Sequence, residues 1–281
     1  MTKDFKDRVT SQYATFTRSQ KMVADYILQH MDSVPFCTLG DLADKIGVST
    51  TTVIRFARSN GCEGYSEMQA VLQDELRRKV SLPSRLDSIH AIPKDELLSH
   101  TMHNDISNIQ RTMSSLSQDT LNDAVAAIAG AQNVYVLGMR TSYALAYYTS
   151  ICLGQIRSNV RLVQANGLIY PEEVLGASAG DVCVAFLFPR YSKVTKTILE
   201  WMREQQVKVV LVTSTNCGAV EYLADWLIPC SVSGVSLKNS YAAPMCVINY
   251  LFASLTQNNR EQTADMLKKA ERLIRDNLGL N

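Results

Sequence analysis

Five short apolar runs that alternate with amphipathic stretches constrain the fold of the second half of this chain. The runs lie at residues 134–137, 160–163, 182–188, 207–212 and 226–229. Helical spacing lies between them, near residues 141–157, 192–205 and 218–224. Buried strands that alternate with helices are typical of parallel sheets, because each strand contacts apolar side chains on both faces. We therefore predict an α/β domain with a parallel five-stranded sheet and helices on both of its faces.

Hydroxyl and basic side chains follow two of these predicted strands, each time just before a helix. Residues 138–142 read Gly-Met-Arg-Thr-Ser, and residues 190–195 read Arg-Tyr-Ser-Lys-Val-Thr. Ligands of open parallel sheets bind beyond the carboxyl ends of the strands, and helix N-termini favour anions. Two arginines there are able to clamp a phosphate or a carboxylate. The predicted effector site consists of Gly138, Arg140, Thr141, Ser142, Arg190, Tyr191, Ser192 and Thr195. The alternative is that these serines and threonines only cap their own helices.

Residues 38–58 predict two short helices joined by a tight turn. Thr38 is a good N-cap, and Gly47 is able to leave the first helix with a positive φ. Ser49 then caps a second helix, whose Val53 and Phe56 recur at helical spacing. A second helix with hydroxyls at its start and arginines further along suits the major groove of DNA. The predicted DNA-binding residues are Thr38, Ser49, Thr50, Thr51, Thr52, Arg55 and Arg58.

The alternative is a helical hairpin that does not bind DNA and whose threonines and arginines only face solvent. A capping box at Thr17-Arg-Ser-Gln20 supplies a further helix for a core, and another begins near Tyr65. We therefore predict an all-α helix-turn-helix domain over residues 1–80. Residues 80–94 lose periodicity and contain two prolines, which indicates a domain boundary. Residues 81–117 are predicted to form a linker and connecting helix, and residues 118–281 the effector-binding and dimerisation domain.

Composition narrows the class of protein. A hydrophobic fraction of 46% permits two cores, and a net charge of +1 means that any basic DNA-binding surface must be local. The seven cysteines are odd in number and scattered, which predicts reduced cytoplasmic residues and no metal site. The charged start of the chain is unlike a signal peptide, and no apolar run is long enough to span a membrane. No cofactor is predicted.

Several motifs of the first part resemble the N-terminal domain of RpiR-type bacterial transcription regulators. They are Phe-Thr-Arg-Ser-Gln-Lys-Met-Val-Ala-Asp-Tyr-Ile-Leu at 16–28, Leu-Ala at 42–43, Gly-Val-Ser at 47–49, Thr-Val-Ile-Arg-Phe at 52–56 and Gly-Cys-Glu-Gly-Tyr at 61–65. The resemblance covers nearly all of residues 14–70. It implies a winged-type or helix-turn-helix domain that docks as a dimer on operator DNA.

The second part resembles the sugar isomerase (SIS) domain over about residues 120–258. Its phosphosugar-binding pattern is matched at Gly138, Ser142, Ser192 and Thr195, and three positions depart from it. Arg140 replaces a second glycine, Arg190 replaces a first serine, and Lys193 replaces the glycine after Ser192. The arrangement Phe-Pro-Arg-Tyr-Ser at 188–192 looks like a variant subset of RpiR-type regulators.

Three functions are compatible with such a chain. An aldose–ketose isomerase needs an acid and a base near the substrate, but all four histidines precede the α/β part, and Glu172, Glu173 and Glu221 lack a telling spacing. A constitutive architectural protein would not respond to small anions. We expect a regulator that senses a phosphosugar or sugar acid, reads an operator with an inverted repeat, and assembles as a homodimer or homotetramer without membrane contact.

Overall fold

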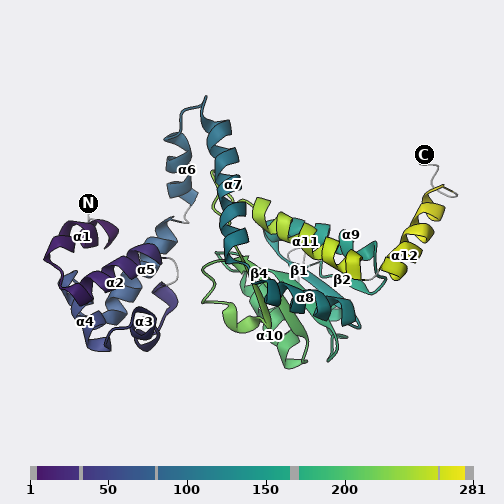
Figure 1. Cartoon of the computed structure of the whole chain (residues 1–281), viewed down its shortest axis with the longest axis horizontal. Coiled ribbons are helices and arrows are strands. Elements are labelled where there is room, and N and C mark those ends of the chain that lie inside the picture. The colour runs from purple at the N-terminus through teal and green to yellow at the C-terminus, as the bar shows by residue number, and fades with distance from the viewer. Residues whose placement is uncertain (1–4, 32–33, 80–81, 165–170, 259, 276–281) are drawn as a thin grey trace. The chain divides into compact units, whose positions relative to one another are not determined.

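The computed structural model describes residues 5–31, 34–79, 82–164, 171–258 and 260–275 of the chain. The chain divides into two compact units, Met1–Ala91 and Ile92–Asn281 (Figure 1). They are called here the N-terminal unit and the C-terminal unit, and each is described by itself.

The described part of the N-terminal unit is helical. Its helices are α1 (Phe5–Gln12), α2 (Arg18–Gln29), α3 (Leu39–Ile46), α4 (Thr50–Ser59), α5 (Tyr65–Lys79) and α6 (Leu82–His90). The predicted capping box is present, because the Thr17 side chain accepts from the Gln20 N–H and the Gln20 side chain accepts from the Thr17 N–H. Val23, Val53 and Phe56 are fully buried in the core of the unit.

Helix α6 lies in the segment 80–94, which the sequence predicts to be a domain boundary. Residues 82–90 are helical although apolar periodicity is lost there, and the two units divide between Ala91 and Ile92 within the same segment. Pro83 is the second residue of α6, and a proline is tolerated there because N–H groups in the first turn have no partner within the helix.

The C-terminal unit contains a parallel sheet, as predicted. Its described strands are β1 (Val134–Gly138), β2 (Val160–Leu162), β3 (Val182–Phe186), β4 (Lys208–Ser214) and β5 (Trp226–Cys230). They lie in the order β2-β1-β3-β4-β5, and each neighbouring pair is parallel. The strand order therefore reverses between β1 and β3, and such a switch point opens a crevice beyond the carboxyl ends of the two strands.

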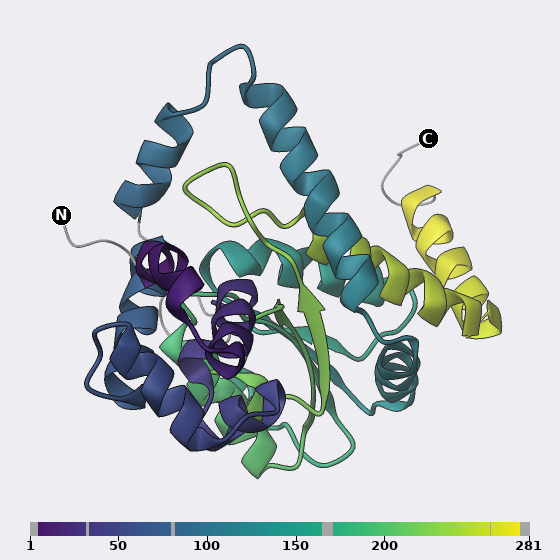
Figure 2. The same cartoon turned by 60° about the vertical axis from the view of Figure 1, so that its left-hand side comes forward.

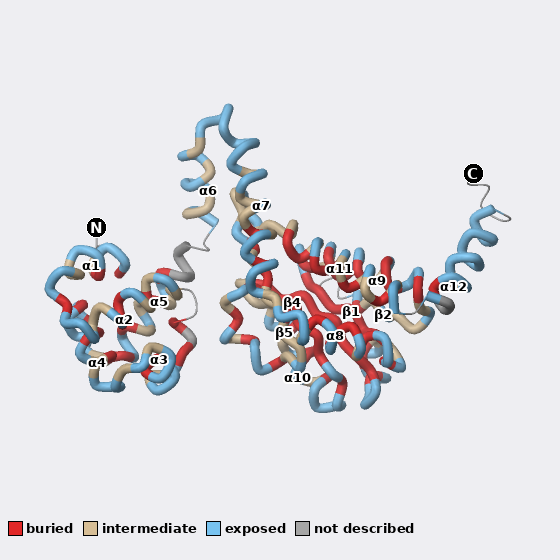
Figure 3. The backbone as a smooth tube through the Cα atoms, viewed as in Figure 1, coloured by how far each residue is buried: buried red, intermediate tan, exposed pale blue. Residues whose placement is uncertain are grey.

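Helices cover both faces of the sheet (Figure 1). Helices α8 (Gln118–Gly130), α9 (Tyr143–Gly154) and α11 (Ala242–Asn258) pack on one face. Helix α10 (Lys193–Glu204) packs on the other face together with short turns. Strands β1 and β3 are buried along their whole length, and the interior of the sheet is red in Figure 3.

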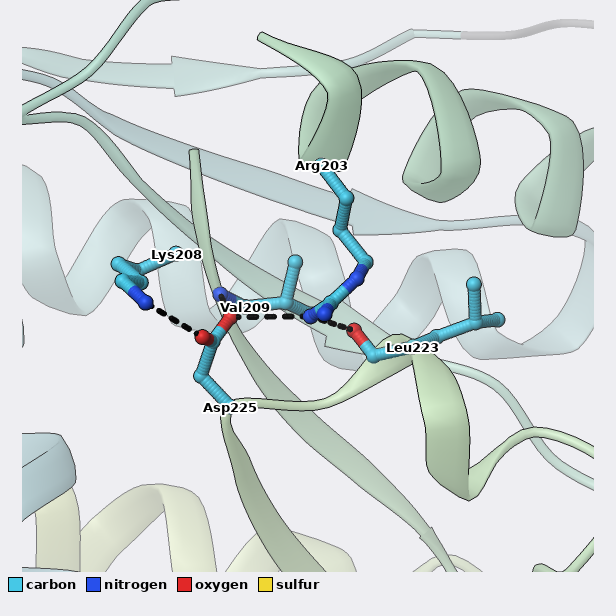
Figure 4. Close-up of polar contacts among 5 residues, drawn as sticks. All are labelled: Arg203, Lys208, Val209, Leu223 and Asp225. Carbon is cyan, nitrogen blue, oxygen red and sulfur yellow. Dashed lines mark hydrogen bonds and ion pairs between the residues drawn. The ribbon is translucent and has the colours of Figure 1, made fainter. Parts of the chain in front are cut away.

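One predicted helix is replaced by a single turn. Residues 218–224 form only the 3-10 turn Glu221–Leu223 before β5. Asp225 follows this turn and accepts the Val209 N–H at 2.9 Å, the Lys208 ammonium at 2.8 Å and the Arg203 guanidinium at 3.2 Å (Figure 4). Arg203 also donates to the Leu223 carbonyl oxygen. This cluster fixes the last turn of α10 against the start of β4 and β5, at the opposite edge of the sheet from the crevice.

Helices α7 (Leu97–Ser115) and α12 (Arg260–Leu273) complete the unit. Helix α7 contacts α11 and β5, while several apolar side chains on its outer side remain exposed. Among them, Leu98 and Met113 are each 70% exposed and Met102 is 55% exposed. None of the described helices has the length and apolar character needed to cross a bilayer.

Candidate functional site

Local capping fixes the geometry of the helical hairpin in the N-terminal unit. Thr38 and Asp41 form a reciprocal capping box at the start of α3. Gly47 ends α3 in the left-handed region with φ 75°, a conformation that costs a residue with a Cβ atom. Ser49 accepts the Thr52 N–H and so begins α4 directly after the turn. The hairpin therefore follows from three local signals that the sequence carries.

The residues predicted to bind DNA divide into two groups in the structure. Thr38 and Ser49 serve as N-caps, and the Thr52 hydroxyl lies 2.9 Å from that of Ser49. The remaining predicted residues all lie exposed on α4: Thr50, Thr51, Arg55 and Arg58. Arg58 uses its Nε–H to donate to the Glu63 carbonyl oxygen at 3.1 Å. Of the predicted DNA-binding residues, Thr50, Thr51 and Arg55 therefore have the side chains best placed to contact DNA.

A second candidate site lies in the crevice of the C-terminal unit. Six of the eight predicted effector residues line one pocket there: Arg140, Thr141, Ser142, Arg190, Ser192 and Thr195. Because the loops after β1 and β3 meet at the switch point, residues 50 positions apart in the sequence share this pocket. This is the meeting of loops that the strand pattern predicted.

The two predicted arginines share an unusual backbone conformation. Arg140 has φ 57° and Arg190 has φ 66°, both in the left-handed region. That region costs an L-residue about 1 kcal/mol or more, and such residues cluster at functional sites. Both side chains are exposed at the pocket. Two arginines therefore line the pocket in a backbone conformation that residues with a Cβ atom rarely adopt.

Gly138 acts through its backbone and does not line the pocket. A Cβ atom at this position would lie 2.5 Å from the Ser142 carbonyl oxygen and 3.1 Å from the Ala146 Cβ. Only glycine lets the end of β1 approach the turn at Arg140–Ser142 this closely. The hydroxyls of that turn are held by Tyr241, whose OH lies 2.9 Å from Thr141 Oγ1 and 3.3 Å from Ser142 Oγ.

Thr195 carries an unsatisfied polar atom. Ser192 caps α10 and accepts the Thr195 N–H, while the Thr195 side chain is fully buried at the pocket. Thr195 Oγ1 has no hydrogen-bond partner among the described residues. A buried hydroxyl without a partner costs roughly 1–3 kcal/mol, so such a group calls for an explanation. A ligand oxygen in the pocket would supply the missing partner.

Tyr191 lies on the other face of the sheet, apart from the predicted site. Its hydroxyl donates to the Asn216 carbonyl oxygen at 3.0 Å, and its ring packs with the cluster around α10. Burial raises the pKa of the Tyr191 hydroxyl above its usual value. Sequence adjacency predicts that Tyr191 joins Arg190 and Ser192 at the site, but the left-handed backbone at Arg190 turns the chain there, and the Tyr191 ring packs on the α10 side of the sheet.

The loop after β5 contributes pocket residues that sequence reasoning missed. Lys238, Asn239 and Tyr241 line the pocket beside the predicted residues. Lys238 adds a third cation, and no carboxylate or imidazole belongs to the described lining. The Glu173 carboxylate instead accepts the Gln164 N–H, and Glu221 lies in the turn before β5. The described lining of this pocket therefore carries positive charge and no acidic side chain.

Comparison with known proteins agrees with both halves of this architecture. The model of the rpiR-family helix-turn-helix domain matches residues 3–79, and the SIS-domain model matches residues 127–254. An HTH-type transcriptional regulator of Haemophilus influenzae is 24% identical over 276 residues, which are 95% of each chain.

Two solved structures share the fold. The sugar isomerase domain of an RpiR transcription factor from Sphaerobacter thermophilus superposes with a TM-score of 0.60 at 23% identity, covering 63% of this chain and 99% of that one. The Vibrio vulnificus NanR protein complexed with ManNAc-6P gives 0.59 at 19% identity, covering 97% of this chain and 98% of that one.

The chain carries a helix-turn-helix unit followed by a parallel α/β unit. This is the domain order of a transcription regulator with a separate ligand-binding domain. Both family models match in the order that this class requires. The chain belongs to the RpiR family of helix-turn-helix transcription regulators and carries a SIS domain in its C-terminal unit.

Proposed function

We propose that this RpiR-family protein binds a sugar-derived anion, a phosphosugar or a sugar acid, in its SIS domain and thereby controls genes of carbohydrate metabolism. The observation that carries the proposal is the buried, unpartnered Thr195 hydroxyl at the first turn of α10, where helix amides favour an anion. Arg140, Arg190 and Lys238 surround the same pocket. NanR, which shares the fold, is complexed with ManNAc-6P, and this supports a phosphosugar as one ligand class.

The proposal takes the SIS domain as a sensor and not as an enzyme. An isomerase must move a proton between two carbons of a sugar, for which it needs a positioned acid and base. The described lining of the pocket offers cations, hydroxyls and an amide for holding an anion. These groups suit binding better than proton transfer, and the H. influenzae relative bears the name of a regulator.

In the N-terminal unit, α4 is the proposed reading helix. Arg55, Thr50 and Thr51 are exposed on it, and Thr38, Ser49, Thr52 and Arg58 support its geometry. We propose that residues 1–80 read the operator, residues 81–117 connect, and residues 118–281 sense and dimerise. A homodimer or homotetramer would read an inverted repeat, because a twofold axis presents two reading helices. Such a regulator acts in the cytoplasm.

Replacing Thr195 with valine tests the sensing site. Thr195→Val removes only the unpartnered hydroxyl, so the ligand-free protein should be as stable as wild type or slightly more stable. A thermal-shift screen of phosphosugars and sugar acids first identifies a ligand, since binding to the folded state raises the Tm. Calorimetry should then show affinity reduced about tenfold in Thr195→Val, the loss of one hydrogen bond to a charged group.

Thr149→Val is the matched control for this experiment. Thr149 is also buried, but its hydroxyl donates to the Leu145 carbonyl oxygen and it does not line the pocket. The control variant should bind the ligand with wild-type affinity. Equal ligand affinity of wild type and Thr195→Val would refute the proposed site.

A further inference from the structure

The loop that brings Lys238 to the pocket is held from its other side by α7. This pocket loop, residues 231–241, leaves β5 and rises beside α7 before α11 begins (Figure 2). Its last part lines the pocket through Lys238, Asn239 and Tyr241. Its first part, Ser231 and Ser233, is hydrogen-bonded to polar side chains of α7.

Asn108 is the centre of this contact and is fully buried. Its Nδ2 donates to the Ser233 carbonyl oxygen at 2.6 Å, and its Oδ1 accepts from Ser231 Oγ at 2.9 Å. Asn104, one turn earlier on α7, donates to the same Ser233 oxygen at 2.7 Å. Thr112, one turn later, accepts the Ser231 N–H at 2.8 Å. Three consecutive turns of α7 therefore hold Ser231 and Ser233 at the start of the pocket loop.

A buried polar contact of this kind specifies position more than it adds stability. Asn108 would be costly to bury without partners, whereas an apolar side chain packed against α11 and β5 would be cheap. Once its hydrogen bonds are made, only one placement of Ser233 satisfies them. The register of the pocket loop along α7 is thereby fixed.

The pocket loop transmits that register to Lys238 because it is closed on itself. Gly234 packs beneath the Lys238 carbonyl group, and a methyl group at Gly234 would overlap its oxygen. Ser236 Oγ donates to the Lys238 carbonyl oxygen and accepts the Lys238 N–H, each at 3.1 Å. The Ser240 N–H donates to the Val232 carbonyl oxygen at 3.3 Å. A shift at Ser233 therefore displaces Lys238 as well.

Helix α7 begins at Leu97, six residues after the end of the N-terminal unit at Ala91. Any change in how α7 is held acts on the segment that connects the two units along the chain. We propose that Asn108 and Asn104 are positioning residues of the anion site, which couple occupation of the pocket to α7 through Ser233. This coupling rests on the proposed function, and a ligand produces it only if it favours one placement of the pocket loop over another.

Hydrogen–deuterium exchange on the full chain tests the coupling, with inorganic phosphate as the probe and chloride at equal ionic strength as its reference. In wild type, phosphate should slow exchange in residues 187–196, in the pocket loop and in residues 100–112 together. Asn108→Asp keeps the shape of Asn108 and the acceptor that Ser231 and Arg111 use, but it places a carboxylate oxygen against the Ser233 carbonyl oxygen. Without phosphate, this variant should speed exchange of the pocket loop about tenfold, because the hydrogen bond from Asn108 to the Ser233 carbonyl oxygen is lost.

In Asn108→Asp, phosphate should still protect residues 187–196 but should no longer protect 100–112. Asn104→Ala removes a less buried donor to the same oxygen and should weaken the coupling in the same direction, so it replaces Asn108→Asp if that variant does not fold. Ser114→Ala is the control, because Ser114 lies on α7 but donates to Gln110 of its own helix. It should behave as wild type.

The outcomes separate the coupling from the proposed function. Phosphate protection of 187–196 with no change in 100–112 of wild type would overturn the coupling and leave the anion site standing. Absence of protection at 187–196 would count against the anion site itself. Unaltered exchange of the pocket loop in both asparagine variants without phosphate would overturn the positioning role, whatever phosphate does.

Discussion

Arg140 and Arg190 both occupy the left-handed region of backbone space, with φ values of 57° and 66°, after two neighbouring strands of one sheet. Glycine adopts this conformation without steric cost, whereas arginine does not. The proposed anion site thus contains two residues with a strained backbone and charged side chains. Strain retained at a ligand pocket suggests that stability and binding are in conflict there.

Arg140→Gly and Arg190→Gly separate that conflict into two measurements. Each variant should raise the free energy of unfolding by about 0.5–1 kcal/mol, offset in part by the greater freedom of glycine in the unfolded chain. Each should also lose affinity for the ligand found by thermal shift, by about tenfold or more. Denaturant titration and calorimetry check the two expectations.

Gln206→Gly is the control for those variants. Gln206 has φ 64°, lies exposed after α10 and does not line the pocket. It should gain stability as the arginine variants do and retain wild-type ligand affinity. Unchanged ligand affinity in both arginine variants would show that the guanidinium groups serve another purpose.

Arg55→Ala should weaken DNA binding without unfolding the N-terminal unit, since Arg55 is exposed on α4. A base contact predicts a loss of about 1–3 kcal/mol, and a phosphate contact predicts a shallower salt dependence. Fluorescence anisotropy over a salt series distinguishes the two, with Lys269→Ala on α12 as control. Wild-type operator affinity and salt slope in Arg55→Ala would remove this residue from the interface.

Self-association should depend on the exposed side of α7. Met102 and Ile106 are 55% and 51% exposed although they are apolar, and one helical turn separates them. The wild-type chain should sediment as a dimer or larger at micromolar concentration, and the double variant Met102→Glu/Ile106→Glu should shift towards monomer. Leu175→Glu, at a position 61% exposed, is the control. A monomeric wild-type chain would contradict this prediction.

Alkaline pH should destabilise the N-terminal unit through Tyr65. Burial raises the pKa of Tyr65 to about 12 from 10.0, and its neutral hydroxyl donates to the Cys37 carbonyl oxygen at 2.7 Å. The folded-state pKa is higher than the unfolded one, so this contribution is complete below pH 10.0 and is lost as pH rises towards 12. Unfolding titrations should show a smaller loss over this interval in Tyr65→Phe than in wild type. Equal losses would contradict the assignment.

The sequence predicted the elements whose signals are local. Ser49 and Gly47 mark the hairpin through capping and φ, and the strand pattern predicts which loops meet at the sheet edge. Lys238 was missed because its loop has no periodicity, and its place at the pocket depends on hydrogen bonds to Asn108, more than 120 residues away. The position of Tyr191 on the α10 side of the sheet depends on the left-handed turn at Arg190, which no local sequence signal indicates.

The central claim is that an anion in the SIS pocket controls operator binding, and one measurement tests it directly. Operator fragments are first selected with wild-type protein from genomic DNA, and their affinity is then measured by anisotropy with and without the ligand found by thermal shift. We expect the ligand to change operator affinity by about 5–150-fold in wild type. Arg140→Gly should retain the ligand-free operator affinity but lose this change. An operator affinity that no phosphosugar or sugar acid alters, or an unchanged response in Arg140→Gly, would contradict the account.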